Sequence, residues 1–194
     1  MRETATLILL AGWAILAGAT HANAQGNANS RGSAQVVALD ECDPPSFNAL
    51  LGESGGGFCH NVSLAALGFA TTLSDLLTVA ENGNPETNPE TSGWDFEPDQ
   101  LTIKQGEVVS VVDEGGEPHT FTEVKAFGNG FLPPLNPGSS TSVIPECSGG
   151  FKNIAVARTR VVQGSRLDVS GLSKGKHLFQ CCIHPWMRME VDVQ

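Results

Sequence analysis

The residues best suited to chemistry lie near the C-terminus and in one upstream segment. Cys181, His184 and Met187 follow one another at C-x-x-H-x-x-M spacing, and a second histidine, His119, follows Pro118. A thiolate, two imidazoles and a thioether make a ligand set of soft sulfur and intermediate nitrogen. A trigonal site of two histidines and one cysteine, with a weak axial methionine, is how proteins hold copper for electron transfer. The pattern therefore predicts a copper site in which a short turn after a strand presents three of the four ligands.

This loop resembles the ligand loop of the cupredoxins, the blue copper proteins, and its compact spacing is most similar to that of amicyanin. Segments 164–169 and 175–181 resemble the paired strands that lead into the ligand loop of plastocyanin and amicyanin. Segments 96–98 and 101–107 resemble the first two strands of those proteins. The resemblance covers roughly the second half of the chain. It implies an all-β fold, a Greek-key β-sandwich.

For the site, the resemblance implies one type 1 copper ion. His119, Cys181 and His184 would be its equatorial ligands and Met187 its axial ligand. By analogy with the family, the edge of His184 near solvent would be the route by which electrons enter and leave. In many relatives an asparagine follows the first histidine and helps to order the ligand loop, whereas this chain has Thr120 at that position.

A second methionine competes for the axial role. Relatives usually have a glycine two residues after the axial methionine, and here that position is Met189. Met189 lies at C-x-x-H-x₄-M spacing, which is the plastocyanin pattern. Alignment of the closing strand, 190–193, places Met187 in register with the family methionine, so Met187 is the predicted ligand.

The chain length and the remaining motifs narrow the kind of copper protein. With 194 residues, the chain fits one core domain plus additions. It lacks the H-x-H and H-C-H clusters that a trinuclear oxidase site needs. Cys181 and Cys182 are adjacent, and neighbouring side chains of an extended segment point to opposite faces, so a mononuclear site is predicted. Four convergent protein ligands leave no open position for a substrate, which predicts that the protein is not an enzyme.

The N-terminus reads as a targeting segment. Arg2 supplies a positive charge, 7–19 form an apolar core, and 22–24 match an A-x-A cleavage site. The pattern predicts a signal peptide over 1–24 and a protein that is periplasmic or secreted. An uncleaved signal anchor is the alternative reading, and no other stretch is apolar enough to cross a bilayer.

The charge of the chain bears on its partners. The formal net charge is -10, which repels nucleic acid and anionic membranes and attracts basic proteins. Redox protein partners such as a basic cytochrome are therefore expected, with the chain itself a monomer. Plain solubility is the competing explanation for the acidic balance.

Three regions follow from the pattern along the chain: the signal peptide, an N-terminal extension and linker over 25–93, and a cupredoxin-like copper-binding domain over 94–194. Residues 25–38 are rich in Gly, Asn and Ser and are expected to lack fixed structure. One or two short helices are expected within 64–80, with Ser74-Asp75 as a helix start.

The second half is expected to be β-structure. Short β-branched runs between Gly and Pro residues predict the strands of a sandwich, namely 101–103, 108–112, 119–124, 154–157 and 160–162. Residues 125–153 form a long insertion rich in Gly and Pro. The sequence leaves open whether it folds against the body or shields the copper end.

Four cysteines remain once Cys181 is assigned to the metal, and four allow three pairings. Cys42 with Cys59 would close a short loop, which leaves Cys147 with Cys182 to tie the insertion beside the site. The rival reading has Cys182 or Cys147 bind metal as well. Two functions therefore compete: a carrier of single electrons between redox partners, and a periplasmic protein for copper delivery or tolerance. A third reading, a domain that keeps the fold without metal and serves as an interaction module, is disfavoured by the complete set of four ligands.

Overall fold

The computed structural model describes residues 32–51, 59–60, 70–82, 85, 88 and 91–194. These residues lie in one compact unit, Arg31–Gln194. The predicted signal peptide lies outside the described residues. Among the helices of the described part, none has the length and apolar character needed to cross a membrane.

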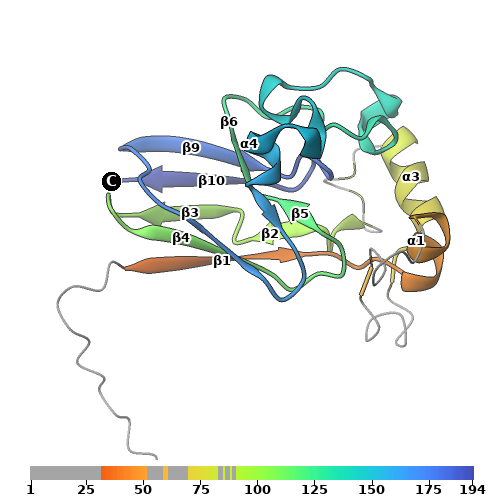
Figure 1. Ribbon diagram of the computed structural model, residues 1–194, viewed down its shortest axis with the longest axis horizontal. Coiled ribbons are helices and arrows are strands. Elements are labelled where there is room, and N and C mark those ends of the chain that lie inside the picture. The colour runs from red at the N-terminus through yellow and green to blue at the C-terminus, as the bar shows by residue number, and fades with distance from the viewer. Residues whose placement is uncertain (1–31, 52–58, 61–69, 83–84, 86–87, 89–90) are drawn as a thin grey trace, which may run out of the picture. The chain divides into compact units, whose positions relative to one another are not determined.

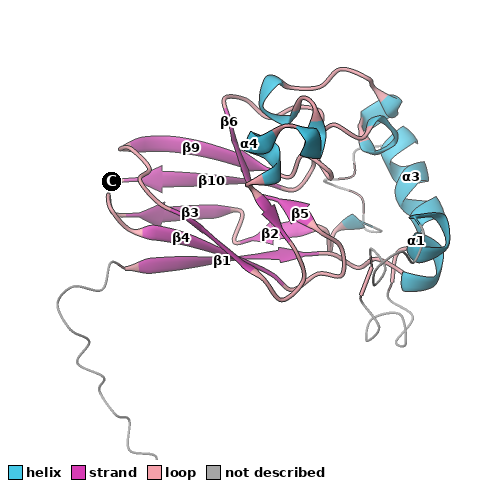
Figure 2. Ribbon diagram, viewed as in Figure 1, coloured by secondary structure: helices cyan, strands magenta, loops and turns pink. Residues whose placement is uncertain are grey.

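Two four-stranded sheets form the body of the fold (Figure 2). The first has the order β2-β1-β4-β8, with bounds Asp95–Glu97, Ser33–Leu39, Val108–Asp113 and Arg166–Val169. The second has the order β3-β10-β9-β6, with bounds Gln100–Ile103, Arg188–Val193, Gly175–Gln180 and Thr122–Val124. In a separate short ribbon, β5 (His119–Thr120) pairs with β7 (Arg160–Val161). The predicted all-β sandwich is confirmed.

The core lies between the sheets and is rich in aromatic side chains. On β10, Met189, Val191 and Val193 are buried at alternate positions, which places one face of the strand in the core. Phe121 stacks on Phe179 with ring centroids 4.3 Å apart, and Phe96 meets Phe121 edge-on at 5.2 Å. Phe121 interrupts the predicted strand 119–124, so that β5 and β6 belong to different sheets.

The first strand, β1, lies in a segment that was expected to lack fixed structure. Residues up to about Ala38 are expected to lack fixed structure, but Ser33–Leu39 forms β1, between β2 and β4. Val36 and Ala38 are fully buried, because alternate small apolar residues of this segment face the core. The sandwich therefore takes a strand from the predicted N-terminal extension as well as strands from 94–194.

Two helices lie at one end of the sandwich, where β9 ends and β10 begins (Figure 1). They are α1 (Pro44–Leu51) and α3 (Leu73–Asn82). The start of α3 lies close to the predicted position, and Thr72 caps it by accepting a hydrogen bond from the backbone N–H of Asp75 at 3.2 Å. The Cys42–Cys59 disulfide, as predicted, holds the chain beside α1.

The insertion contains short helical turns. Four are 3-10 helices, with bounds Pro133–Leu135, Pro137–Ser139, Pro145–Cys147 and Gly150–Lys152. The prediction of a strand over 154–157 is wrong, since Ile154–Ala157 forms helix α4. The side chain of Asn153 accepts a hydrogen bond from the N–H of Ala155 and stabilises this turn, and only Val156 of the run is buried.

Candidate metal centre

Three of the four predicted ligands meet at the end of the sandwich that carries α1 and α3. The Sγ of Cys181 lies 4.0 Å from Nδ1 of His119 and 3.9 Å from Nδ1 of His184. The two Nδ1 atoms are 3.3 Å apart. All three side chains are fully buried. The structure thus brings together residues that are more than sixty positions apart in the chain, because β5 and the loop after β9 lie side by side.

The spacing of the three donor atoms suits a single metal ion. The centre of a triangle with these sides lies about 2.2 Å from each corner, and metal–nitrogen and metal–sulfur bonds in proteins measure about 2.0–2.3 Å. One thiolate with two imidazoles is also the donor set that copper accepts in a trigonal site. The residues therefore fit the predicted ion in both distance and chemistry.

A buried carboxylate holds the first histidine. Nε2 of His119 lies 2.9 Å from Oδ2 of Asp40, so Nδ1 is the nitrogen that faces Cys181. Asp40 also accepts hydrogen bonds from the backbone N–H groups of Cys42 and Glu117, which fixes the segment before His119. Burial raises the pKa of the Asp40 carboxyl, but these bonds and the adjacent imidazole outweigh it and lower the pKa below its usual value. No local motif marks Asp40 in the sequence, so sequence reasoning missed it.

The surroundings of Cys181 favour its thiolate form. Two backbone N–H groups, those of Thr120 and His184, donate to Sγ of Cys181 at 3.4 Å each. Burial raises the pKa of the thiol, yet the hydrogen bonds and charges of His119 and His184 bring it well below the usual value. Because the thiolate is the form that binds metal, the environment favours metal binding before any ion arrives.

A tight loop delivers the second histidine. The N–H of Cys181 donates to the carbonyl of Met187, and the N–H of Met187 donates to the carbonyl of His184, both at 3.0 Å. The His184 ring packs edge-on against Trp94 at 4.8 Å and near Trp186 at 5.4 Å. Trp186 therefore lies beside the site, while Trp94 is a neighbour that the sequence did not indicate.

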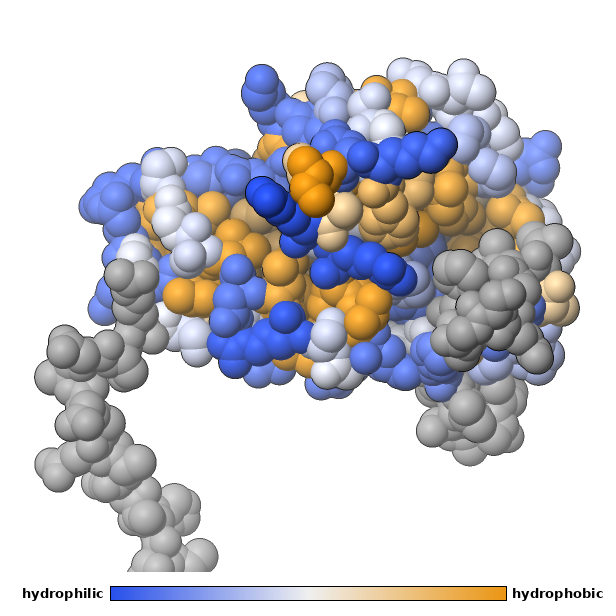
Figure 3. Space-filling model, viewed as in Figure 1, coloured by the Kyte–Doolittle hydropathy of each residue, from blue (hydrophilic) through white to orange (hydrophobic). Residues whose placement is uncertain are grey.

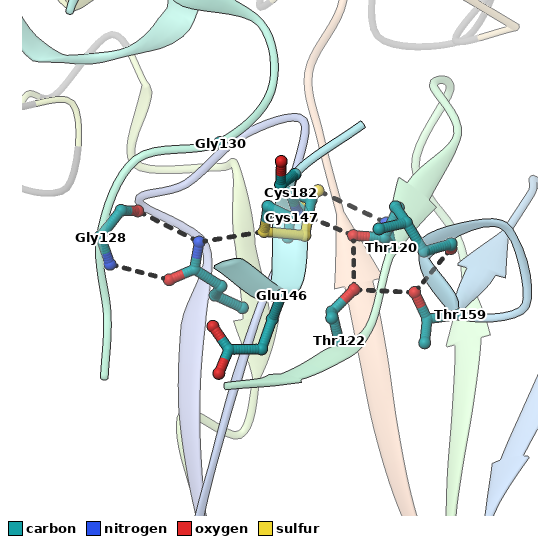
Figure 4. The surroundings of a disulfide bond; sticks show 12 residues. Thr120, Thr122, Gly128, Gly130, Glu146, Cys147, Thr159 and Cys182 are labelled. Carbon is teal, nitrogen blue, oxygen red and sulfur yellow. Dashed lines mark hydrogen bonds between the residues drawn. A yellow bond between two sulfur atoms is a disulfide. The ribbon is translucent and has the colours of Figure 1, made fainter. Parts of the chain in front are cut away.

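Thr120 takes the place of the asparagine found in relatives. Its N–H donates to Sγ of Cys181, and its Oγ1 accepts a hydrogen bond of 2.7 Å from the N–H of Cys182 (Figure 4). Thr122 in turn links Thr120 to Thr159 through hydroxyl groups. One threonine thus joins the first histidine strand to the ligand loop.

The second predicted disulfide is confirmed and lies next to the site. Cys147 is bonded to Cys182, and of the five cysteines, all within the described residues, Cys181 alone has no disulfide partner. The insertion is held here by further contacts: the N–H of Phe131 donates to the carbonyl of Cys182 at 2.9 Å, and a Cβ at Gly130 would lie 2.2 Å from the same oxygen. The insertion therefore folds against the ligand loop (Figure 4).

The two methionines lie in one core cluster but on different elements. Met187 is fully buried within the ligand loop, and its backbone closes that loop. Met189 lies on β10 opposite Phe179, with its side chain in the core between the sheets. The axial role of Met187 stays a prediction.

One expectation about the site is wrong. The family analogy implies a solvent-near edge of His184, but this side chain is 1% exposed. Its Nε2 lies 3.1 Å from Oε2 of Glu117, whose side chain is 7% exposed. Burial lowers the pKa of His184, but the Cys181 thiolate and the Glu117 carboxylate raise it above its usual value. The ring is covered because α1, α3 and the insertion add a layer of protein at this end.

Comparisons with known proteins yield structures only. No protein-family model matches the chain. No curated protein matches it either. Among solved structures, a purple cupredoxin from Nitrosopumilus maritimus is 20% identical, with 59% of this chain and 95% of that chain covered and a TM-score of 0.37.

Two further structures are similar at the same level. A reduced amicyanin variant is 18% identical, with 52% of this chain and 73% of that chain covered and a TM-score of 0.33. A copper-containing nitrite reductase from Thermus scotoductus is 20% identical, with 53% of this chain but only 20% of that chain covered and a TM-score of 0.34. The first two are of the class that the ligand loop resembles.

Proposed function

We propose that this chain is an exported protein that holds one type 1 copper ion through His119, Cys181, His184 and Met187 and passes single electrons between redox partners. The observation that carries the proposal is the triangle of one sulfur and two nitrogen donors, spaced for one ion and closed to solvent. Copper bound there would supply a centre that exists in two oxidation states one electron apart.

The chain contributes a rigid frame. Asp40 fixes the orientation of His119, and two backbone N–H groups fix the sulfur of Cys181. Donors held in place by buried bonds move little when charge changes, which favours fast electron transfer. All three donor side chains are buried, and this supports an electron carrier over an enzyme.

Compartment and partners belong to the same proposal. Two disulfides form in the fold, and disulfides persist in oxidising compartments such as the periplasm or the outside of the cell. The net charge of -10 favours basic redox partners such as a cytochrome.

The surroundings of the site favour electron transfer over copper delivery. Delivery predicts extra soft ligands at Cys182 and Met189. Cys182 is bonded to Cys147, and Met189 packs in the core opposite Phe179. Neither side chain is available to a second ion in this arrangement.

The visible spectrum of the protein with Cu(II) tests the proposal. We expect an intense blue or green band from thiolate-to-copper charge transfer, and Cys181→Ser should abolish it. His177→Gln is the matched control, because His177 bonds to Glu123 and Ser173 away from the donors and its loss should leave the colour intact. A colourless, tetragonal copper spectrum in the wild type would rule out the type 1 site.

A further inference from the structure

A cavity of about 650 Å³ lies against the His184 end of the site. Elements from three parts of the chain surround it, namely α1, α3 and the insertion. Its lining is mostly apolar and includes Phe47, Leu73, Leu77, Phe131, Leu135 and Ile183. Three polar side chains, Glu117, His184 and Arg160, also line it. This volume lies within the range of about 300–1,000 Å³ that is usual for small-molecule sites.

The exposed fractions distinguish the mouth of the cavity from its floor. Leu132 and Phe151 are 38% and 40% exposed and therefore lie at the mouth. Glu117 and His184 are almost completely enclosed and form the floor. Apolar atoms gather at α4 and between α4 and α3 on the face shown in Figure 3. The cavity thus leads from an apolar opening to a polar floor beside a predicted ligand.

The polar floor has few hydrogen-bond partners. Nε2 of His184 lies 3.1 Å from Oε2 of Glu117 and makes no other polar contact that satisfies it within the described residues. Apart from that contact, no described residue bonds to the Glu117 carboxylate, whose own N–H donates to Asp40. Buried polar groups in native proteins are nearly always paired. A buried carboxylate at the end of an apolar cavity therefore indicates a ligand that supplies a donor.

We propose that this cavity binds a small, uncharged aromatic molecule that carries a hydroxyl group, a phenol in chemical class. Its ring packs among the phenylalanine side chains, and its O–H donates to the carboxylate of Glu117. The bound molecule lies against the imidazole of His184, so a small molecule rather than water covers this side of the site. Binding of this kind does not depend on metal.

The charges at the cavity select the hydroxyl over other head groups. An anionic head would be repelled by Glu117, and it would lose its hydration on entering the apolar lining. A cationic head would lose its hydration on entering the apolar lining, and it would pass the exposed guanidinium of Arg160, which lies 5.2 Å over the ring of Phe151 at the mouth. A neutral hydroxyl avoids both costs and still makes a charge-assisted hydrogen bond with Glu117.

Calorimetric titration of the metal-free, full-length protein with 4-ethylphenol tests the proposal. We expect one molecule bound per chain, with weaker binding of 4-methylanisole, benzoate and benzylamine. Glu117→Gln should weaken 4-ethylphenol binding about tenfold or more, since the charged acceptor is lost. Leu77→Trp should abolish binding by filling the cavity. The matched control is Leu167→Trp, another half-buried leucine, on β8, and it should leave the affinity unchanged.

Several outcomes would overturn the proposal. They are no binding in the wild type, equal binding in Leu77→Trp, and a preference for the amine or the acid. Sedimentation that shows two copies associating through the mouth would also overturn it, because a second chain would then be the occupant. Circular dichroism verifies that each variant is folded. The cavity is tested by calorimetry on the metal-free protein, whereas the copper site is tested by the visible spectrum with Cu(II). Either proposal can therefore fail without the other.

Discussion

Nε2 of His119 lies 2.9 Å from Oδ2 of Asp40, and both side chains are enclosed by the protein. This bond decides which ring nitrogen faces Cys181. Asp40 directly follows β1, so the pairing of β1 with β2 and β4 places this carboxylate behind His119. A carboxylate behind a ligand histidine fixes the ring and raises its basicity.

Asp40→Asn should lower the affinity for copper by about 10–100-fold, because the amide keeps the shape but not the charge behind His119. A competition titration with a Cu(I) chelator measures this. Asp192→Asn, on an exposed position of β10, is the control and should leave the affinity unchanged. Equal copper affinities for the two variants would mean that the charge of Asp40 does not support His119 as a ligand.

Thr120→Val should destabilise the fold by about 1–3 kcal/mol, because the N–H of Cys182 loses its buried acceptor. Chemical denaturation of the metal-free protein gives the free energy of unfolding. Thr102→Val, an exposed threonine on β3, provides the comparison and should change stability by less than about 0.5 kcal/mol. A Thr120→Val variant as stable as the wild type would show that the hydroxyl does not order the ligand loop.

Met187→Leu should keep the blue colour but raise the reduction potential, because an axial thioether stabilises the oxidised ion. Met189→Leu should leave the potential nearly unchanged, since Met189 lies on β10 opposite Phe179 and outside the ligand loop. Protein-film voltammetry on both variants measures the difference. The reverse result would make Met189 the axial ligand, at the longer C-x-x-H-x₄-M spacing.

Counting thiols under denaturing conditions should give one thiol per metal-free chain, that of Cys181. Cys182→Ser should lower stability by about 2–5 kcal/mol, as removal of a native disulfide does, and should keep the copper colour. A second tightly bound Cu(I) ion that disappears in this variant would favour copper delivery instead.

The sequence was informative where chemistry is local. The C-x-x-H-x-x-M loop is recognised from its spacing. Of the three pairings that four cysteines allow, the sequence favoured Cys42–Cys59 and Cys147–Cys182, and the structure has both. The alternation of Met189, Val191 and Val193 matches a strand with one face in the core.

The sequence was uninformative where partners come from distant segments. Asp40 lies 79 positions from His119, and nothing in its own segment indicates a metal site. Glu117 precedes the first histidine by two residues, but its role depends on how α3 and the insertion cover His184. The run 154–157 contains β-branched residues, yet Asn153 caps it into a helical turn. Long-range packing decided the first two outcomes, and a local cap decided the third.

Asp113 should make the stability of the metal-free protein fall as pH rises. This side chain is buried, and neither carboxylate oxygen has a hydrogen-bond partner among the described residues. Burial raises the pKa of Asp113 to about 7, from 3.8, with the charge of His119 opposing the shift. The native state therefore holds this proton more tightly than the unfolded state does. The stabilisation is fully present below pH 3.8 and is lost as pH rises through about 7.

Asp113→Asn removes this titration and should therefore raise stability more at pH 8 than at pH 5. The gain at pH 8 should exceed the gain at pH 5 by a few kcal/mol, since each unit of pKa shift corresponds to about 1.4 kcal/mol. Thermal unfolding of wild type and variant at both pH values measures the difference. Asp192→Asn, exposed to solvent, should give the same small effect at both. An equal gain at pH 5 and pH 8 for Asp113→Asn would show that the Asp113 carboxyl is already ionised at the lower pH and that burial does not control its proton.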